Sequence, residues 1–175
     1  ACALRKLKVD SIFIGRLGKD DFGKKFIEQF NELYVNLDFL QLDNDSSTRV
    51  VNVERDQFGD RFFSGFEQSS HSYFADEAFC KKLIEKELPN LEKFLLETKY
   101  LVSGTIALSS PISKETIFFI IEQAKKFEVR VVIDLNWREV FWDYSNFSSN
   151  IIQRDRIDLI KKFLSYADVL KLAKE

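Results

Sequence analysis

Three polar side chains at alternate positions, Asp134, Asn136 and Arg138, follow an apolar run that begins at Val129. Alternate residues of an extended segment point to the same side, so a carboxylate, an amide and a guanidinium are predicted to share one face. Such a set can bind sugar hydroxyls and a phosphate together, because the planar guanidinium of Arg presents two donors to phosphate oxygens. The alternative is a loop in which Asp134 only pairs with Arg138.

The element that must position these groups is a strand over residues 129–135. A continuous Val/Ile run is typical of a strand that is buried on both faces of a parallel sheet. Ligands of open α/β sheets bind at the carboxyl ends of the strands, which is where Asp134 is expected. The aromatic residues that follow are predicted to form a hydrophobic plug rather than a stacking platform: Trp137, Phe141 and Trp142.

The rest of the chain alternates between strand and helix patterns. Strands are predicted at 9–15, 38–45, 49–55, 61–66, 100–105 and 168–172. Helices are predicted at 21–34, 76–88, 91–96, 111–127 and 154–165, with Ser113 as a cap, and residues 1–7 are typical of the last turns of a helix. This order predicts right-handed βαβ units, and therefore an α/β fold with a largely parallel sheet and helices on both faces.

The segment from Gly15 to Gly23 connects the first strand to the first long helix through a tight loop at 16–20. A glycine-rich turn in this place can cradle a phosphate with its backbone N–H groups. Its spacing is neither Gly-x-Gly-x-x-Gly nor Gly-x-x-x-x-Gly-Lys-Ser/Thr. A plain strand-to-helix turn, with Asp20 or Asp21 capping the helix, is therefore the alternative.

Two alternating runs, residues 49–55 and 61–66, flank a turn that contains Gly59, which predicts a β-hairpin. A hairpin over a cleft can act as a lid that excludes water from a transfer reaction. A solvated charged strand face and an edge used in dimerisation are the alternatives. The polar residues on these runs are Arg49, Asn52, Arg55 and Arg61.

The composition excludes several classes of function. The chain has 175 residues, 45% of them hydrophobic, and a formal net charge of -2, which suits one globular domain without a basic surface for nucleic acid. No apolar stretch approaches the ~20 residues of a membrane span, so no membrane partner is expected. Cys2 and Cys80 lack metal-site spacing and indicate a reducing compartment. His71 lies in a polar loop without a second metal ligand or a nucleophile nearby in sequence.

These motifs, in this order, resemble the ribokinase-like (PfkB-type) carbohydrate kinases, and the fructokinase branch most closely. The resemblance covers the whole chain. It rests on residues 1–26, on the Thr-Arg-Val at 48–50, and on three later stretches, LVSGT (101–105), VVIDLNWREVFW (131–142) and YADVLKL (166–172).

The resemblance implies a three-layer α/β/α sandwich in one incomplete domain, residues 1–175, with a β lid at 38–67 through which two copies dimerise. It implies transfer of the γ-phosphate of ATP to a sugar hydroxyl, with Mg²⁺ present, in the cytoplasm or the plastid stroma. The site residues it implies lie in four places: Gly15 and Gly18 near the sugar pocket, Arg49 and Phe63 on the lid, Gly104 and Thr105 on the cleft floor, and Asn136 and Arg138 between sugar and phosphate.

Several family motifs are not found in these residues. The family's Gly-Gly segment is expected upstream of Ala1, and its Gly-x-Gly-Asp, with the general base and anion hole, downstream of Glu175, as are the adenine-binding segments. Ala173 stands where the family's Asn-x-x-Glu begins. No catalytic residue and no metal ligand is therefore assigned, and the chain alone is expected to be an inactive part of a fructose kinase. The alternatives are a non-catalytic binding or regulatory protein on this fold, or a nucleoside or sugar-acid kinase.

Overall fold

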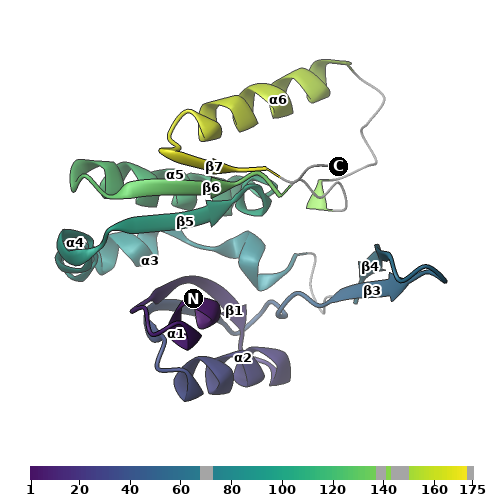
Figure 1. The fold of residues 1–175 in the computed structure, drawn as a ribbon, viewed down its shortest axis with the longest axis horizontal. Helices are drawn as coiled ribbons and strands as arrows, with labels where there is room; N and C mark the ends of the chain where they lie inside the picture. Colours follow the sequence, from purple (N-terminus) through teal and green to yellow (C-terminus); the bar gives the residue numbers. More distant parts are fainter. Residues whose placement is uncertain (68–72, 137–140, 143–149, 173–175) are drawn as a thin grey trace. The chain divides into compact units, whose positions relative to one another are not determined.

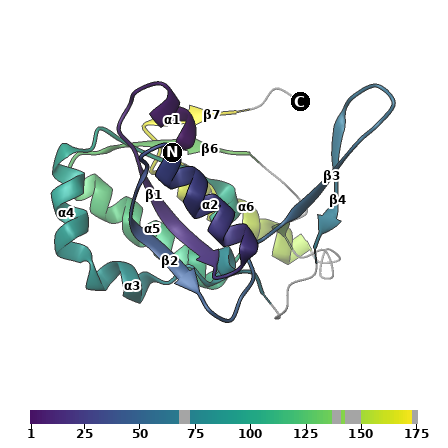
Figure 2. The same cartoon turned by 90° about the horizontal axis from the view of Figure 1, so that it is seen from below.

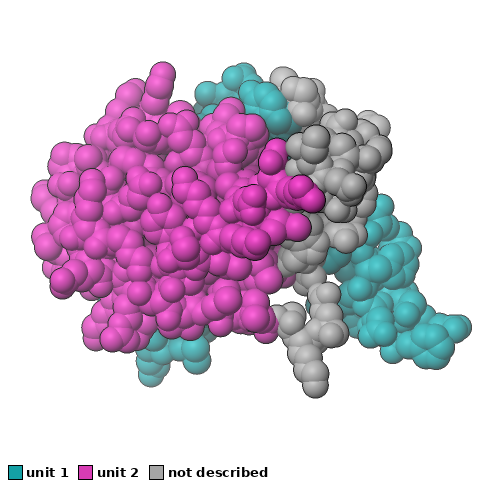
Figure 3. All heavy atoms as spheres, turned by 90° about the horizontal axis from the view of Figure 1, so that it is seen from above, with its two compact units in different colours: residues 1–79 teal, residues 80–175 magenta. Residues whose placement is uncertain are grey.

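The computed structural model describes residues 1–67, 73–136, 141–142 and 150–172. It divides into two compact units, Ala1–Phe79 and Cys80–Glu175, coloured separately in Figure 3. The assignment of residues 1–175 to one domain stays a prediction.

The first unit is built on a parallel strand–helix–strand arrangement (Figure 1). Strands β1 and β2 pair in parallel, and helix α2 connects them and packs on both. The elements of this unit are α1 (Cys2–Lys6), β1 (Ile12–Gly18), α2 (Asp21–Glu32), β2 (Asn36–Asp43), β3 (Val51–Arg55), β4 (Arg61–Phe66) and the 3-10 helix η1 (Ala75–Ala78).

Strand β1 begins and ends later than the pattern predicts. The predicted strand at 9–15 and the predicted loop at 16–20 are wrong, because β1 continues to Gly18. The reason is long-range pairing: Arg16, Leu17 and Gly18 align with residues 41–43 of β2, so the ladder extends through both glycines. The spacing of apolar residues in the sequence does not show which residues of β2 align with β1.

The predicted β-hairpin is confirmed: β3 and β4 pair antiparallel and run side by side as a ribbon (Figure 2). Its turn is closed by the Asp56 carboxylate, which accepts hydrogen bonds from the N–H groups of Phe58 and Asp60. Gly59 supplies the positive φ, +87°, that a turn of this kind requires. The first part of the predicted β lid at 38–67 does not belong to the hairpin, since β2 pairs with β1.

The second unit holds three parallel strands in the order β5-β6-β7. Helices lie between successive strands, as expected for βαβ connections. Its elements are α3 (Lys81–Lys86), α4 (Leu88–Glu97), β5 (Tyr100–Gly104), η2 (Thr105–Leu108), α5 (Pro111–Lys126), β6 (Arg130–Asp134), α6 (Asn150–Leu164) and β7 (Val169–Lys171). The α/β class, the mostly parallel sheets and the small hairpin are thus confirmed.

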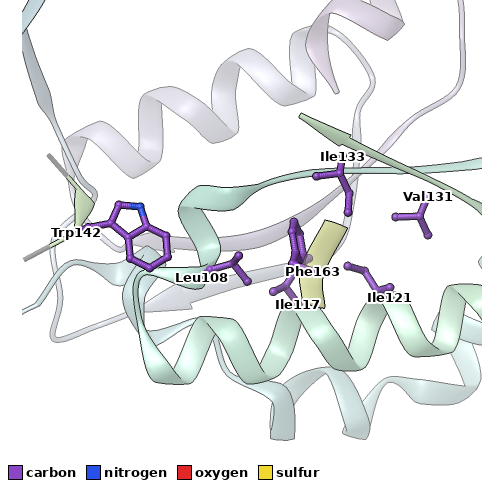
Figure 4. Close-up of a cluster of buried hydrophobic side chains, with 7 residues drawn as sticks. All are labelled: Leu108, Ile117, Ile121, Val131, Ile133, Trp142 and Phe163. Atoms are coloured by element: carbon purple, nitrogen blue, oxygen red, sulfur yellow. The ribbon is translucent and has the colours of Figure 1, made fainter. Parts of the chain in front are cut away.

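The core of the second unit lies between one face of β6 and the two helices α5 and α6 (Figure 4). The ring of Phe163 on α6 meets that of Phe118 on α5 edge to face, with centroids 5.8 Å apart. Trp142 is buried in this cluster and Phe141 packs against it, which confirms the plug for these two residues, while Trp137 lies outside the described residues. The buried members are Leu108, Ile117, Ile121, Val131, Ile133, Trp142 and Phe163.

Two helix starts test the capping predictions. Asp20 is the N-cap of α2, and its carboxylate accepts from the Gly23 N–H at 2.7 Å, which confirms one of the two predicted caps. Ser113 is not a cap. Helix α5 begins at Pro111 after Ser110, and the buried Ser113 hydroxyl donates to the Ala107 carbonyl instead. Pro111 occupies the first helical position, which its fixed φ suits, so Ser113 lies inside the helix and cannot cap it.

Candidate functional site

The carboxyl ends of β5, β6 and β7 bring together the polar groups that the second unit offers. Parallel strands end at the same edge of a sheet, and here they end in Gly104, Asp134 and Lys171, which align with one another across the ladder. We call this group, together with Thr105 and Asn136, the carboxyl-edge cluster. It joins three of the predicted site residues, Gly104, Thr105 and Asn136.

Hydrogen bonds fix the backbone of the carboxyl-edge cluster. The hydroxyl of Thr105, which is 1% exposed, donates to the Leu135 carbonyl at 2.6 Å. The N–H of Leu135 in turn donates to the Lys171 carbonyl at 3.0 Å. The backbone that follows β6 is therefore hydrogen-bonded to residues from both neighbouring strands. The side chains of Asp134 and Lys171 lie at the carboxyl edge of the sheet.

Lys171 is a member of the cluster that the sequence patterns did not identify. Its ammonium lies 2.7 Å from the Asp134 carboxylate, with the two side chains 72% and 32% exposed. A lysine that closes a short apolar strand at the carboxyl end of a parallel sheet was the available signal. An ammonium and a carboxylate at this exposure can exchange their mutual contact for a ligand at little cost, because surface pairs contribute only about 0–1 kcal/mol.

The prediction that Asp134, Asn136 and Arg138 share one face of an extended segment is wrong at Asn136. Strand β6 ends at Asp134, and Asn136 has a φ of +20°, so the alternation stops before it. The Asn136 N–H donates to the Asp134 carboxylate at 3.3 Å, which turns the chain locally. Arg138 lies outside the described residues, and Asp134 pairs with Lys171.

Three backbone donors of the glycine turn of the first unit, residues 18–23, are already engaged. Gly18 N–H donates to the Thr48 hydroxyl at 3.0 Å, Lys19 N–H to the Asp43 carbonyl at 2.7 Å, and Gly23 N–H to Asp20. A phosphate cradle needs such N–H groups free. The geometry therefore favours the strand-to-helix turn over the phosphate-binding alternative.

A side chain at Gly18 has no room among backbone atoms, whereas one at Gly15 would displace the ring of Phe13. A Cβ on Gly18 would meet the Thr48 nitrogen at 2.5 Å, and one on Gly15 would meet the ring of Phe13 at 2.8 Å. An open hollow of about 320 Å³ adjoins the turn. Its lining is Gly18, Lys19, Asp20, Asp21, Lys24, Ile27 and Leu42.

A buried ion pair lies beside the glycine turn. The guanidinium of Arg16 contacts one oxygen of Asp43 through Nε at 2.9 Å and Nη2 at 2.7 Å, while the other Asp43 oxygen accepts from the N–H groups of Asp45 and Ser46. Burial acts to raise the pKa of Asp43, but these hydrogen bonds outweigh it, and the pKa lies below its ordinary value. The pair ties the end of β2 to β1, and sequence patterns gave no signal for it.

Arg49 is held inside the first unit. Its guanidinium stacks between the rings of Phe66 and Phe74, with its carbon 4.8 Å and 4.4 Å from their centroids, and it pairs with Asp76 at 3.0 Å and Glu77 at 3.2 Å. We call this arrangement the arginine clamp. Phe63 lies on β4 and is 41% exposed. The sugar contacts expected of Arg49 and Phe63 stay predictions.

Comparison with known proteins adds to this geometry. The chain matches the pfkB family of carbohydrate kinases over residues 1–174. It is 29% identical, over 100% of its length and 50% of the relative's, to the fructokinase of Klebsiella pneumoniae. The chain thus spans about half the length of the curated relatives it matches.

Solved structures share the fold. The fructokinase of Xylella fastidiosa superposes with a TM-score of 0.78 at 23% identity, covering 97% of this chain and 47% of that one, and it is also solved with ATP bound. The fructokinase of Vibrio cholerae O395, bound to fructose, ADP and calcium ion, superposes with a TM-score of 0.70 at 23% identity, covering 98% and 49%. The fold is therefore the ribokinase-like α/β fold, and the chain belongs to the pfkB family of carbohydrate kinases.

Proposed function

We propose that this chain is part of an ATP-dependent carbohydrate kinase that transfers the γ-phosphate of ATP to a hydroxyl of a fructose-like sugar. The carboxyl-edge cluster is the observation that carries the proposal. It gathers an amide, a carboxylate, an ammonium and a buried hydroxyl at the ends of three parallel strands, where ligands of α/β sheets bind. The choice of fructose rests on the fructokinases among its relatives.

The residues of the cluster have distinct proposed roles. Asn136 and Arg138 hold the sugar where it meets the transferred phosphate, and Gly104 and Thr105 form the floor of that place. The Lys171 ammonium stabilises negative charge that develops on the transferred group, because a fixed cation near developing charge lowers the barrier. Gly15, Gly18, Arg49 and Phe63 are proposed on the sugar side, with the hairpin as the lid.

The proposal assigns the general base to residues other than these 175. No Gly-x-Gly-Asp occurs in the sequence, whose glycines stand at 15, 18, 23, 59, 65 and 104. A missing base lowers a rate by about 10²–10⁴. The chain by itself is therefore proposed to have no measurable kinase activity.

Mg²⁺ is proposed for the full-length kinase, and the structure assigns it no ligands. Within the described ranges, no three His, Cys, Asp or Glu side chains lie together as a metal site. No helix among the described residues is long and apolar enough to cross a membrane. Cytoplasmic or stromal location, and a homodimer formed through the hairpin, remain parts of the proposal.

The test is a coupled assay on the full-length gene product with ATP, Mg²⁺ and fructose. Turnover that depends on both ATP and sugar supports the proposal, and the 175-residue chain alone is the matched inactive control. A second candidate, a non-catalytic protein on the same fold, is favoured by Ala173 at the family's Asn-x-x-Glu position. Absence of Gly-x-Gly-Asp from the full-length gene product, with no turnover on any sugar, would establish it.

A further inference from the structure

The carboxylate of Asp20 serves two backbone segments at once. One oxygen accepts from Gly23 N–H at 2.7 Å and so caps α2. The other oxygen accepts from Thr48 N–H at 2.6 Å, 28 residues away, where the chain approaches the hairpin. A helix cap needs only the first of these bonds, so the second has a different consequence.

Thr48 also contacts the glycine turn through its side chain. Its hydroxyl accepts from the Gly18 N–H at 3.0 Å, and the residue is 6% exposed. A Cβ on Gly23 would meet the Gly18 carbonyl oxygen at 2.0 Å, and one on Gly18 would meet the Thr48 nitrogen at 2.5 Å, so the backbone at these three residues is closely packed. The glycine turn and the backbone at Thr48 therefore move as one body.

The residue after Thr48 is Arg49, and the arginine clamp connects the fixed backbone at Thr48 to the hairpin. Its guanidinium stacks on Phe66, the last residue of β4, while its own backbone leads into β3. The chain that leaves the hairpin is tied to the chain that approaches it, since Glu67 N–H donates to the Val50 carbonyl at 3.1 Å. Both ends of the hairpin are thus fixed within two residues of Thr48 or of the clamp.

We propose that Asp20 is a positioning residue that couples the glycine turn to the root of the β3–β4 hairpin. The inference rests on the proposed function insofar as the hairpin closes over a sugar. Through Asp20, the position of the turn that carries Gly18 sets the position at which the hairpin leaves the first unit. Asp20 acts through Thr48 and touches no reacting atom.

Burial acts to raise the pKa of Asp20, but the hydrogen bonds from Gly23 and Thr48 outweigh it and hold the pKa below its ordinary value. Asp20 is therefore ionised at neutral pH, and both of its oxygens accept. An Asn at this position has one acceptor oxygen and one amide donor, so it can keep only one of the two bonds.

The substitution that separates capping from coupling is Asp20→Ser. Serine is a good N-cap, so the bond to Gly23 is kept while the one to Thr48 is lost. Asp21→Asn is the matched control, because Asp21 is the adjacent carboxylate, is exposed, and belongs to the first turn of the same helix. Asp20→Ala removes both bonds and reports the effect of a lost cap.

Two measurements on the full-length gene product decide the matter. In Asp20→Ser, amide hydrogen exchange at Thr48 and along the hairpin root, residues 50–52 and 65–67, is expected to accelerate about tenfold, which is the equivalent of one lost hydrogen bond. The KM for sugar is expected to rise about tenfold with a much smaller change in kcat, because only the closure over the sugar is weakened. Asp21→Asn is expected to change neither.

The outcomes separate the coupling from the proposed function. If exchange accelerates at Thr48 alone and the hairpin root is unchanged, or if KM matches that of wild type, the coupling is wrong. If Asp20→Ser and Asp20→Ala lower kcat and the amount of active protein equally, with KM unchanged, then Asp20 has only a structural role. That result would also contradict the coupling. Should the wild-type protein lack sugar kinase activity, the proposed function fails, and hydrogen exchange alone decides the coupling.

Discussion

The ammonium of Lys171 and the carboxylate of Asp134 lie 2.7 Å apart across the carboxyl ends of two neighbouring parallel strands. The same sheet carries an equivalent pair near its amino-terminal edge, where Lys125 contacts Asp168 at 2.6 Å and Asp168 also accepts from the Val131 N–H. Both pairs join a lysine ammonium to an aspartate carboxylate, but they lie at opposite edges of the sheet. If position at the carboxyl edge of the sheet matters for the proposed activity, only the first pair is expected to contribute to it.

Lys171→Met in the full-length gene product is expected to lower kcat by about 10²–10³-fold, since a positioned donor at the reacting group contributes about 2.7–4 kcal/mol in comparable sites. The free energy of unfolding is expected to change by less than about 1 kcal/mol, because the pair is exposed. Steady-state kinetics and urea denaturation measure the two effects.

Lys125→Met is the control for that prediction. It removes the pair at the other edge of the sheet and is expected to leave kcat unchanged within about twofold, with a stability change of the same small size. Equal losses of activity in the two variants would show that Lys171 acts only through general stability, and the role assigned to it would be wrong.

A second prediction concerns the buried hydroxyl of Thr105. Thr105→Val keeps the shape of the side chain and removes the donor to the Leu135 carbonyl, so the free energy of unfolding should fall by about 1–3 kcal/mol. Thr105→Ser keeps the donor and should recover most of the hydrogen bond, at the smaller cost of one buried methyl group, about 1 kcal/mol. Valine and serine variants of equal stability would contradict this account.

A third prediction compares Gly23 and Gly104, two glycines whose surroundings differ. Gly23→Ala places a Cβ 2.0 Å from the Gly18 carbonyl oxygen, and backbone must shift to accommodate it, so a loss of about 3 kcal/mol or more is expected. Gly104→Ala meets only the Asp134 carbonyl oxygen at 3.4 Å and should cost less than about 1 kcal/mol. Denaturant midpoints of the two variants, measured side by side, check the order, and a reversed order would exclude the close packing described at Gly23.

A fourth prediction follows from the lowered pKa of Asp43. A carboxylate whose folded pKa lies below its unfolded value of about 3.8 stabilises the fold at pH values above the unfolded pKa. That contribution is lost as the pH falls through the folded pKa. Asp43→Asn is therefore expected to cost about 3–5 kcal/mol at pH 7, because it leaves Arg16 buried without its charge partner.

The Asp43→Asn cost should shrink steadily below pH 4, as the wild-type carboxylate becomes protonated too. Urea denaturation of wild type and variant from pH 7 to pH 3 measures this difference. Asp38→Asn, at an exposed carboxylate of the same strand, is the control and should show a small cost at every pH. A difference for Asp43→Asn that stays constant with pH would show that its charge is not what stabilises the pair.

Local patterns were sufficient for the alternation of strands and helices, for the hairpin and for the Asp20 cap. The single helix predicted at 76–88 is wrong, because the structure has the 3-10 helix η1 and the separate helix α3 there. Local patterns were also insufficient for the limits of β1, because its last three residues are held in the strand by pairing with β2, whose distance in sequence no local window spans. The start of α5 at Pro111 was predicted, but Ser113 lies inside the helix, and its hydroxyl donates to the Ala107 carbonyl, a contact that the local pattern did not indicate.

The candidate site was predictable where it followed a strong strand pattern and not elsewhere. Asn136 followed from an apolar run that ends in polar residues, whereas Gly104 and Thr105 were predicted as site residues only from the resemblance to the carbohydrate kinase family. The strand that carries Lys171 was predicted at 168–172, but its contact with Asp134 depends on the pairing of β6 with β7, which the local pattern does not show. The partners of Arg49 likewise become visible only when residues 49, 66 and 74–77 are brought together by the fold. Such contacts depend on long-range packing that sequence spacing does not encode.

The central claim is that these residues belong to a kinase that phosphorylates a fructose-like sugar. The most direct measurement is ³¹P NMR of the full-length gene product incubated with ATP, Mg²⁺ and fructose, which separates a sugar phosphate from inorganic phosphate. We predict a sugar phosphate resonance that grows as the γ-phosphate of ATP declines, and none with the 175-residue chain alone. Formation of inorganic phosphate only, or no consumption of ATP with any sugar tested, would contradict the account.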